Sequence, residues 1–350
     1  MTQETNIPEI KQLELELQNN PLDVSLMNQL AIAYLPHNEI SYGKTLELLH
    51  RAFEISPSIK TANNYAYQLI AEWYECEKGI EVLLPFMDQK PKSYMPYALI
   101  GYAYLMIENY SNAESYLEKA NSLSPTEKVE IIHNLGLSKS HLKKHSEAMA
   151  LYEKSIEIMD SDNLSKYNKA LCHIDLHQNK QVNKLINEIR KTEAYQDPTG
   201  DVSNLDLSLL SFLNNDLEQA YQLLMENDNF RYPFEPEVCY LLLKFNPSKY
   251  QELAAEEIES AANLIKDIKN PKSEDYANFS DQERATEIIE LQEEIEKIKN
   301  TELELKNIPE VKTKESYRSI FCGCLFYDCK MHGTAFDDLS VNKNYIENQI

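Results

Sequence analysis

Hydrophobic, small and polar positions recur in the same order in two successive stretches, residues 97–125 and residues 132–160. Small residues stand where two helices would cross, and large residues stand between them. The first stretch holds Tyr97, Ile100, Gly101, Tyr104, Ala113, Leu117, Ala120 and Pro125, and the second holds Ile132, Leu135, Gly136, Lys139, Ala148, Tyr152, Ser155 and Asp160. A period of about 35 residues with one helical hairpin per unit is typical of a helical repeat array.

Weaker copies of this pattern lie on both sides. Residues 21–57 and 58–91 precede the two regular units, and residues 162–192 and 201–227 follow them. The fifth unit is degenerate, because Lys169 and His173 occupy positions that are apolar or aromatic elsewhere. Pro198 and Gly200 then interrupt the pattern, as these residues do between helices.

The repeated positions resemble the tetratricopeptide repeat family. This resemblance implies an all-α fold, a right-handed α-α superhelix with extra C-terminal helices and a small C-terminal segment. The expected parts are a capping helix at residues 1–20, about six hairpins at 21–228, additional helices or a cap at 229–270, a loop and a long amphipathic helix at 271–307, and a cysteine-containing segment at 308–350.

Local signals predict where several helices begin. Ser111 with Glu114, Ser124 with Glu127, and Ser280 with Glu283 each have the spacing of a capping box. Ser248 with Gln251 has it as well, directly after Pro247. The last helix carries apolar residues at heptad spacing, as a coiled coil does, but Glu302 breaks the pattern. This favours packing on the solenoid over a weak homo-oligomer formed through residues 281–307.

Composition and charge narrow the class of protein. The net charge is −23, so bare nucleic acid is not expected as a partner and a basic protein or peptide is favoured. The alternative is that the acidity only keeps a helical protein dissolved. Neither an apolar run long enough for a membrane span nor a secretory signal is visible, and the six cysteines suggest no disulfide framework. These features predict a cytoplasmic protein without a membrane partner.

The resemblance also implies a binding face, since the first helix of each repeat lines a concave groove. The positions that it places in the groove are Asn28, Asn63, Tyr67, Met95, Tyr102, Met106, Glu130, His133, His141, Tyr167 and Asp175. Some family members bind acidic C-terminal tails through Lys, Arg and Asn, but here these positions are mostly neutral, aromatic or acidic. A partner with exposed Lys, Arg or aliphatic residues is therefore expected.

A second candidate site lies near the C-terminus, where Cys322, Cys324, Cys329 and His332 could bind zinc. The spacing differs from the paired cysteines of common zinc modules, and ordinary reduced cysteines in a buried apolar segment explain the cluster as well. No cofactor other than this zinc is indicated.

Motifs for catalysis are lacking, so an enzyme is not predicted. The favoured function is an adaptor or scaffold that binds a protein or peptide in the groove. One alternative is an immunity protein, antitoxin or secretion chaperone dedicated to one basic toxin or effector. Another is a zinc-binding regulator that uses the C-terminal cluster.

Overall fold

A computed structural model describes residues 7–35, 43–196, 201–226, 236–270, 272–273, 275–276, 278–304, 318–321 and 323–328. The chain forms two compact units. Unit 1 combines Met1–Cys172 with Glu315–Ile350, and unit 2 is His173–Lys314. Within the described residues every regular element of secondary structure is a helix, and there is no strand. The expected all-α solenoid is therefore confirmed, although its handedness stays a prediction.

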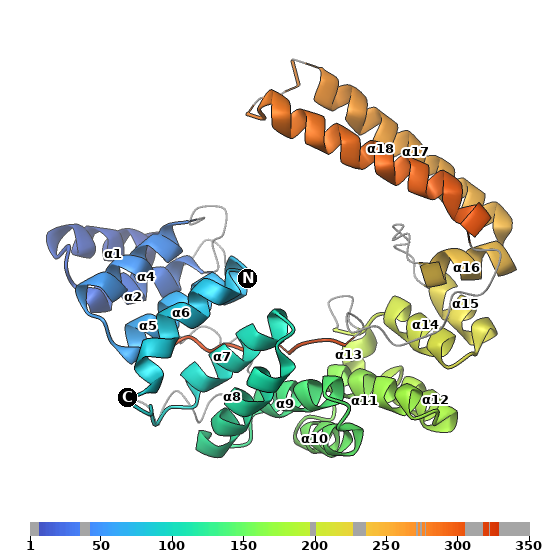
Figure 1. Cartoon of the computed structure of the whole chain (residues 1–350). Helices are drawn as coiled ribbons and strands as arrows, with labels where there is room; N and C mark the ends of the chain where they lie inside the picture. The colour runs from blue at the N-terminus through green and yellow to red at the C-terminus, as the bar shows by residue number, and fades with distance from the viewer. Residues whose placement is uncertain are drawn as a thin grey trace. The chain divides into compact units, whose positions relative to one another are not determined.

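Unit 1 is a series of helical hairpins, coloured blue to green in Figure 1. Its helices are α1 (Ile7–Asn19), α2 (Val24–Tyr34), α4 (Lys44–Ile55), α5 (Ile59–Tyr67), the π-helix η1 (Gln68–Glu72), α6 (Cys76–Met87), α7 (Met95–Met106), α8 (Tyr110–Leu123), α9 (Val129–His141), α10 (His145–Ile158) and α11 (Asn163–Asp175).

The two most regular hairpins cross at equivalent glycines. A Cβ atom on Gly101 would lie 2.6 Å from Cγ of Leu117, and one on Gly136 would lie 2.8 Å from Cε1 of Tyr152. Real Cβ atoms do not approach other atoms so closely, so each glycine lets its helix pack directly against a large side chain of the next. The sequence pattern placed these two pairs one repeat apart, and the structure places them at matching crossings.

Several predicted helix starts are wrong by a few residues. Ser124 is the C-cap of α8 and has an extended backbone, as expected for a residue that precedes proline, so α9 begins only after Lys128. The caps of α8 and α17 are asparagines, Asn109 and Asn246, rather than the serines two residues further on. At Ser280 the capping box is present, because Ser280 and Glu283 hydrogen-bond reciprocally.

Unit 2 contains shorter hairpins followed by a long one. Its helices are α12 (Asn179–Ile189), α13 (Glu193–Gln196), α14 (Asn204–Leu213), α15 (Leu217–Met225), α16 (Pro236–Phe245), α17 (Pro247–Lys269) and α18 (Asp281–Glu304). The core around α14–α16 includes Phe212, Leu224 and Leu242. In Figure 1, α17 and α18 lie side by side, and Ile298 of α18 is buried.

No helix in the described part of the chain is long and apolar enough to cross a membrane.

Candidate peptide-binding groove

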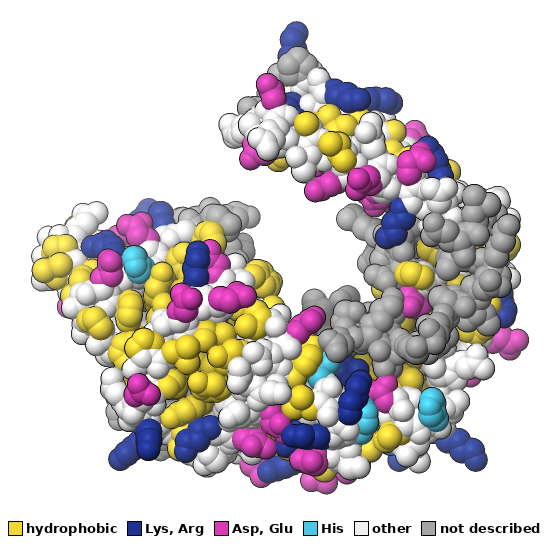
Figure 2. Space-filling view, in the orientation of Figure 1, with side chains coloured by type: hydrophobic (Ala, Val, Ile, Leu, Met, Phe, Trp, Pro, Cys, Tyr) yellow, Lys and Arg dark blue, Asp and Glu magenta, His cyan; other side chains and the backbone are white. Residues whose placement is uncertain are grey.

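An extended stretch near the C-terminus lies along the first helices of the hairpins of unit 1. We call residues 318–321 and 323–328 the groove segment. It is the orange-red trace that passes α7 and α9 in Figure 1, and hydrogen bonds tie it to α5, α9 and α11. On the face shown in Figure 2, hydrophobic side chains gather in the region of α5, α6 and α7.

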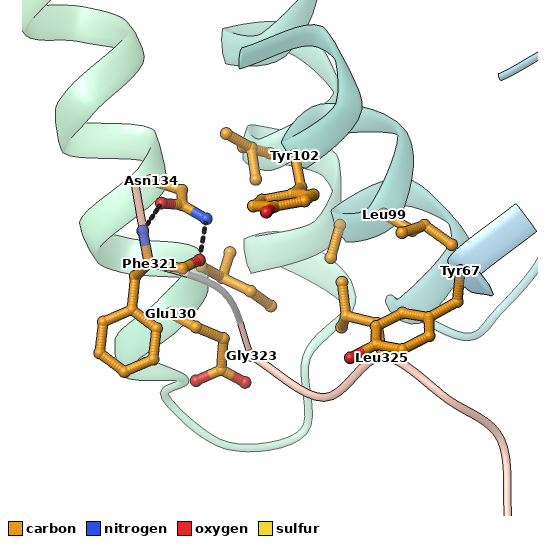
Figure 3. Close-up of a pocket in the computed structure, with 11 residues that line it drawn as sticks. Tyr67, Leu99, Tyr102, Glu130, Asn134, Phe321, Gly323 and Leu325 are labelled. Atoms are coloured by element: carbon orange, nitrogen blue, oxygen red, sulfur yellow. Dashed lines mark hydrogen bonds between the residues drawn. The ribbon is translucent and has the colours of Figure 1, made fainter. Parts of the chain in front are cut away.

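Three asparagines hold the backbone of this segment in the same way. Each donates from Nδ2 to the carbonyl oxygen of one segment residue and accepts at Oδ1 from the backbone N–H of that same residue. Asn64 binds Tyr327 at 3.1 and 2.7 Å, Asn134 binds Phe321 at 2.8 and 2.9 Å, and Asn168 binds Ser319 at 2.8 and 3.1 Å. We call Asn64, Asn134 and Asn168 the groove asparagines, and Figure 3 shows the pair between Asn134 and Phe321.

This geometry suits an extended peptide of many sequences. The N–H and C=O of one residue in a β-conformation point to the same side, so a single side-chain amide can satisfy both. The groove asparagines contact only main-chain atoms of the segment, which every residue except proline offers in full. They therefore supply affinity and register, as main-chain contacts do when an extended peptide adds to a sheet edge.

The α7 helix interrupts the series of asparagines. Leu99 stands in α7 at the position that corresponds to Asn64 in α5 and Asn134 in α9, one repeat away from each. Leu99 and Tyr102 line a pocket beneath Gly323 and Leu325, shown in Figure 3. Here the segment meets apolar side chains, so contact with the third repeat depends on shape and burial rather than on hydrogen bonds.

Further polar contacts complete the binding of the backbone. His133 approaches the Ser319 carbonyl oxygen through Nε2 at 2.9 Å, and its Nδ1 lies 2.8 Å from the Ser165 hydroxyl. Asn63 donates from Nδ2 to the Leu325 carbonyl oxygen at 2.7 Å. Buried polar groups stabilise a fold only when they have partners, so these pairs favour the segment in its place.

Side chains of the segment occupy distinct places in the groove. Leu325 and Phe326 are buried, and the Phe326 ring meets Tyr67 edge-on with centroids 5.8 Å apart. Arg318 is also buried and donates from Nε to the Ser140 hydroxyl at 2.8 Å. At the other end Asp328 forms an exposed ion pair with Lys60.

Ionisable groups in the groove have shifted pKa values. Burial raises the pKa of the Glu130 carboxyl, which lies against Gly323, although nearby Lys128 opposes the shift. Burial lowers the pKa of Lys128 itself, and burial raises the pKa of the Tyr327 hydroxyl. The groove therefore disfavours unpaired charge, which agrees with the mostly neutral segment that it holds.

Five of the predicted groove residues bind the segment or line the pocket beneath it. They are Asn63, Tyr67, Tyr102, Glu130 and His133. Asn28 contacts the groove asparagine Asn64, because its Oδ1 accepts a hydrogen bond from Nδ2 of Asn64 at 2.7 Å. The remaining positions are the buried Met95 and Tyr167, the half-buried Met106 and Asp175, and His141, whose ring stacks on Tyr110 at 3.9 Å.

The groove asparagines are the residues that the sequence prediction missed. It selected Asn63, His133 and Tyr167, each exactly one residue before a groove asparagine. A usable signal was present, because asparagine recurs at Asn28, Asn64, Asn134 and Asn168 with the period of the repeats or twice that period. The C-terminal segment itself was not predicted to enter the groove.

The predicted zinc ligands lie mostly outside the described residues. Cys322, Cys329 and His332 fall there. Cys324 is half-buried and packs against the core of unit 1. Among the described residues no group of three or more His, Cys, Asp or Glu is arranged to bind a metal ion.

Comparison with known proteins matches the most regular part of unit 1. The family model described as tetratricopeptide repeat matches residues 96–127 and 129–159. A tetratricopeptide repeat protein from Parabacteroides merdae ATCC 43184 has a similar structure, with a TM-score of 0.50 and 16% identity over 68% of this chain and 91% of that chain. No curated protein sequence matches the chain.

Two further solved structures are similar at lower scores. The Pseudomonas aeruginosa pilF structure has a TM-score of 0.48 and 18% identity, covering 63% of this chain and 97% of that chain. MamA from Desulfovibrio magneticus RS-1 has a TM-score of 0.39 and 18% identity, covering 45% of this chain and 88% of that chain. The likeness to the Parabacteroides merdae protein, at 16% identity, establishes the fold alone.

Proposed function

The chain belongs to the tetratricopeptide repeat family, and from that premise we propose that unit 1 is a scaffold that binds an extended peptide of a partner protein in its groove. The observation that carries this proposal is the bidentate binding of three segment residues by the groove asparagines. Such a series of contacts suits any extended chain of compatible side chains. Nothing in it requires that the peptide belong to the same molecule.

The groove segment then acts as an intramolecular competitor of the partner. A segment tethered to its own binding site experiences an effective concentration of about millimolar when the tether is short and flexible. If the segment itself binds the open groove with about micromolar intrinsic affinity, an effective concentration of about millimolar weakens partner binding roughly a thousandfold, because only a small fraction of grooves is open. To displace the segment, a partner must either bind the groove more tightly than the segment does or contact a second site on the chain.

The groove interior and the outer surface of the chain favour different charges in the partner. Inside the groove, the occupant is mostly neutral, with Arg318 at one end and Asp328 at the other. Outside it, the chain as a whole carries a net charge of −23. A partner that presents an apolar peptide flanked by basic regions fits both, and its affinity should fall with rising salt.

The test uses the full chain with the segment released. Phe321→Pro together with Tyr327→Pro removes the two N–H groups that donate to Asn134 and Asn64, so the segment should leave the groove. A fluorescent peptide of residues 317–328, kept reduced, should bind this variant by anisotropy with about micromolar affinity, and the wild type far more weakly.

Two controls make the test decisive. Trypsin should cleave after Arg318 in the proline variant and spare the buried Arg318 of the wild type, which shows that the segment has left. Adding Asn134→Ala to the released chain should abolish peptide binding. If the released chain is cleaved yet binds no peptide, the segment is a structural element of unit 1 and the proposal is wrong.

Partner capture distinguishes the adaptor from a protein dedicated to a single toxin or effector. The released variant, used as bait with mass spectrometry, should retain several proteins that share a short motif if the chain is an adaptor. One stoichiometric basic protein would instead favour the dedicated immunity or chaperone function. If crosslinks instead join the segment of one copy to the groove of another copy, the partner is a second copy of this chain.

A further inference from the structure

We infer that the groove selects its peptide by two side-chain positions, an arginine and a glycine five residues after it, which Arg318 and Gly323 occupy in the groove segment. This inference rests on the proposed function and deepens it, because it names the class of peptide that the groove takes. The groove asparagines read the backbone without regard to sequence. Selectivity must therefore come from places where the groove limits a side chain's size or partners it chemically.

The glycine position is limited by Glu130. A Cβ atom on Gly323 would lie 2.7 Å from Cγ and 3.1 Å from Cβ of Glu130, both in α9. Figure 3 shows the Glu130 side chain beside Gly323, with Leu325 further along the segment. Atoms near the base of the glutamate cannot swing away as its carboxyl end can. Any larger residue must move α9 or lift the segment, and lifting it would strain the neighbouring bond to Asn134.

The arginine position is a buried polar site. Arg318 is 7% exposed, and its Nε donates to the Ser140 hydroxyl, which also lies 3.2 Å from Sγ of Cys172. The guanidinium lies close enough to the buried Tyr152 hydroxyl to affect its pKa. A residue without a guanidinium leaves buried polar groups short of a donor, which costs more than the loss of an exposed contact.

Spacing links the two positions to the register of the backbone. Asn168 holds Ser319, directly after the arginine, and Asn134 holds Phe321, two residues before the glycine. A peptide can therefore place arginine and glycine correctly only when they are separated as in the groove segment. The partner is expected to carry an extended, mostly apolar stretch in which arginine precedes glycine by five residues.

The experiment compares three fluorescent peptides on the released chain, the full chain with Phe321→Pro and Tyr327→Pro. The peptides are residues 317–328 unchanged, with Gly323→Ala, and with Arg318→Gln. We expect the alanine peptide to bind about tenfold more weakly than the unchanged one. We expect the glutamine peptide to bind at least about tenfold more weakly.

A smaller side chain at position 130 tests whether Glu130 is what excludes residues larger than glycine from the glycine position. Glu130→Ala in the released chain removes the Cγ atom and should restore most of the affinity for the alanine peptide. Glu127→Ala, at an exposed position in the turn that precedes α9, is the matched control and should restore nothing. Circular dichroism and thermal melting verify that each chain variant is folded.

The possible outcomes distinguish peptide binding by the groove from selection of arginine and glycine in the peptide. If no peptide binds a released chain that trypsin cleaves after Arg318, the proposed function fails. If all three peptides bind equally, the groove binds peptides and the motif is wrong. If the alanine peptide is weakened but Glu130→Ala does not restore it, the glycine acts through the backbone of the peptide and Glu130 does not select it.

Discussion

Helices α9 and α12 belong to the same kind of hairpin, yet they are buried very differently. In α9 almost every residue from Val129 to Ser140 is buried, whereas α12 buries only Val182, Leu185, Ile186 and Ile189 along one stripe. An amphipathic helix of a solenoid normally buries one face. The two helices take different places in their hairpins, because α9 is a first helix and α12 a second one, and α10, the second helix after α9, also buries only Ala148, Tyr152 and Ser155. The groove segment adds to the burial of α9 through its bonds to His133 and Asn134.

The face of α9 that the groove segment covers explains the polar residues inside this helix. His133, Asn134, Ser138 and Ser140 are buried, and each has a hydrogen-bond partner. In a helix with one buried stripe, side chains of this kind would face water. Their burial with partners indicates a face built to hold a peptide backbone, and such a face becomes costly when the peptide leaves, because the partners are then replaced by water.

The largest expected effect comes from removing two groove asparagines together. Asn134→Ala with Asn168→Ala deletes four hydrogen bonds to the segment, and at about 1 kcal/mol each the segment loses roughly 4 kcal/mol of docking free energy. Trypsin should then cleave after Arg318, as followed by mass spectrometry. Asn187→Ala in α12, at an exposed position, is the matched control. An unchanged cleavage rate in the double variant would mean that other contacts hold the segment.

A substitution at the crossing of α9 and α10 should have the next largest effect. Gly136→Val places a branched side chain against Tyr152, and overpacking of this kind typically costs about 1–3 kcal/mol of unfolding free energy. Urea denaturation measures the loss. Tyr152→Leu in the same chain should recover part of it, since the ring is the obstacle. Equal stability of wild type and Gly136→Val would contradict the close crossing.

Acid should weaken the contact between α8 and α9. Burial would raise the pKa of Glu114, but hydrogen bonds from Lys139 and Lys144 outweigh it and hold this pKa below its usual 4.5. A carboxyl with a lowered folded-state pKa stabilises the fold above pH 4.5 and loses this contribution as pH falls through the folded-state pKa. The melting temperature should therefore change less with pH below 4.5 in the Glu114→Gln variant than in the wild type. If the melting temperatures of the two proteins change with pH in parallel, the Glu114 carboxyl is not the cause of the loss of stability in acid.

The smallest expected effect is at the exposed end of the segment. The side chains of Lys60 and Asp328 are 50% and 45% exposed, and pairs in such settings contribute about 0–1 kcal/mol. Lys60→Ala should leave cleavage after Arg318 nearly unchanged at physiological salt. A large increase would show that the charged end, rather than the groove asparagines, determines how tightly the segment is held.

The repeats were predictable because their signals are local and periodic. Gly101 with Leu117 and Gly136 with Tyr152 lie within single hairpins, so a small residue and a large one at constant spacing identify each crossing. The helix starts were less predictable. At α8 and α17 an asparagine two residues before the serine caps the helix, because neighbouring residues can satisfy the same backbone N–H groups. At α9 Lys128 stands at the cap position and makes no side-chain cap bond.

The residues on the face that holds the groove segment were predicted in part, because Asn63 and His133 hydrogen-bond to the segment but the groove asparagines were not selected. The inward positions carried over from the family fell on Asn63, His133 and Tyr167, and the helical turn that decides between adjacent positions depends on how each helix rotates against its neighbours. A shift of one residue turns a side chain by about 100° around the helix. Tertiary packing therefore chose Asn64, Asn134 and Asn168.

The sequence by itself determined the hairpins and the crossings that stack them, since contacts between residues close in the chain leave a periodic trace. Only the tertiary structure decided what fills the groove. The segment reaches Asn64 from more than 250 positions away in the chain, with sequence separations of 263 for the Tyr327 bonds. Most of its hydrogen bonds to the groove use main-chain atoms, which every residue shares. A contact that depends on backbone groups leaves no side-chain pattern in the segment to announce it.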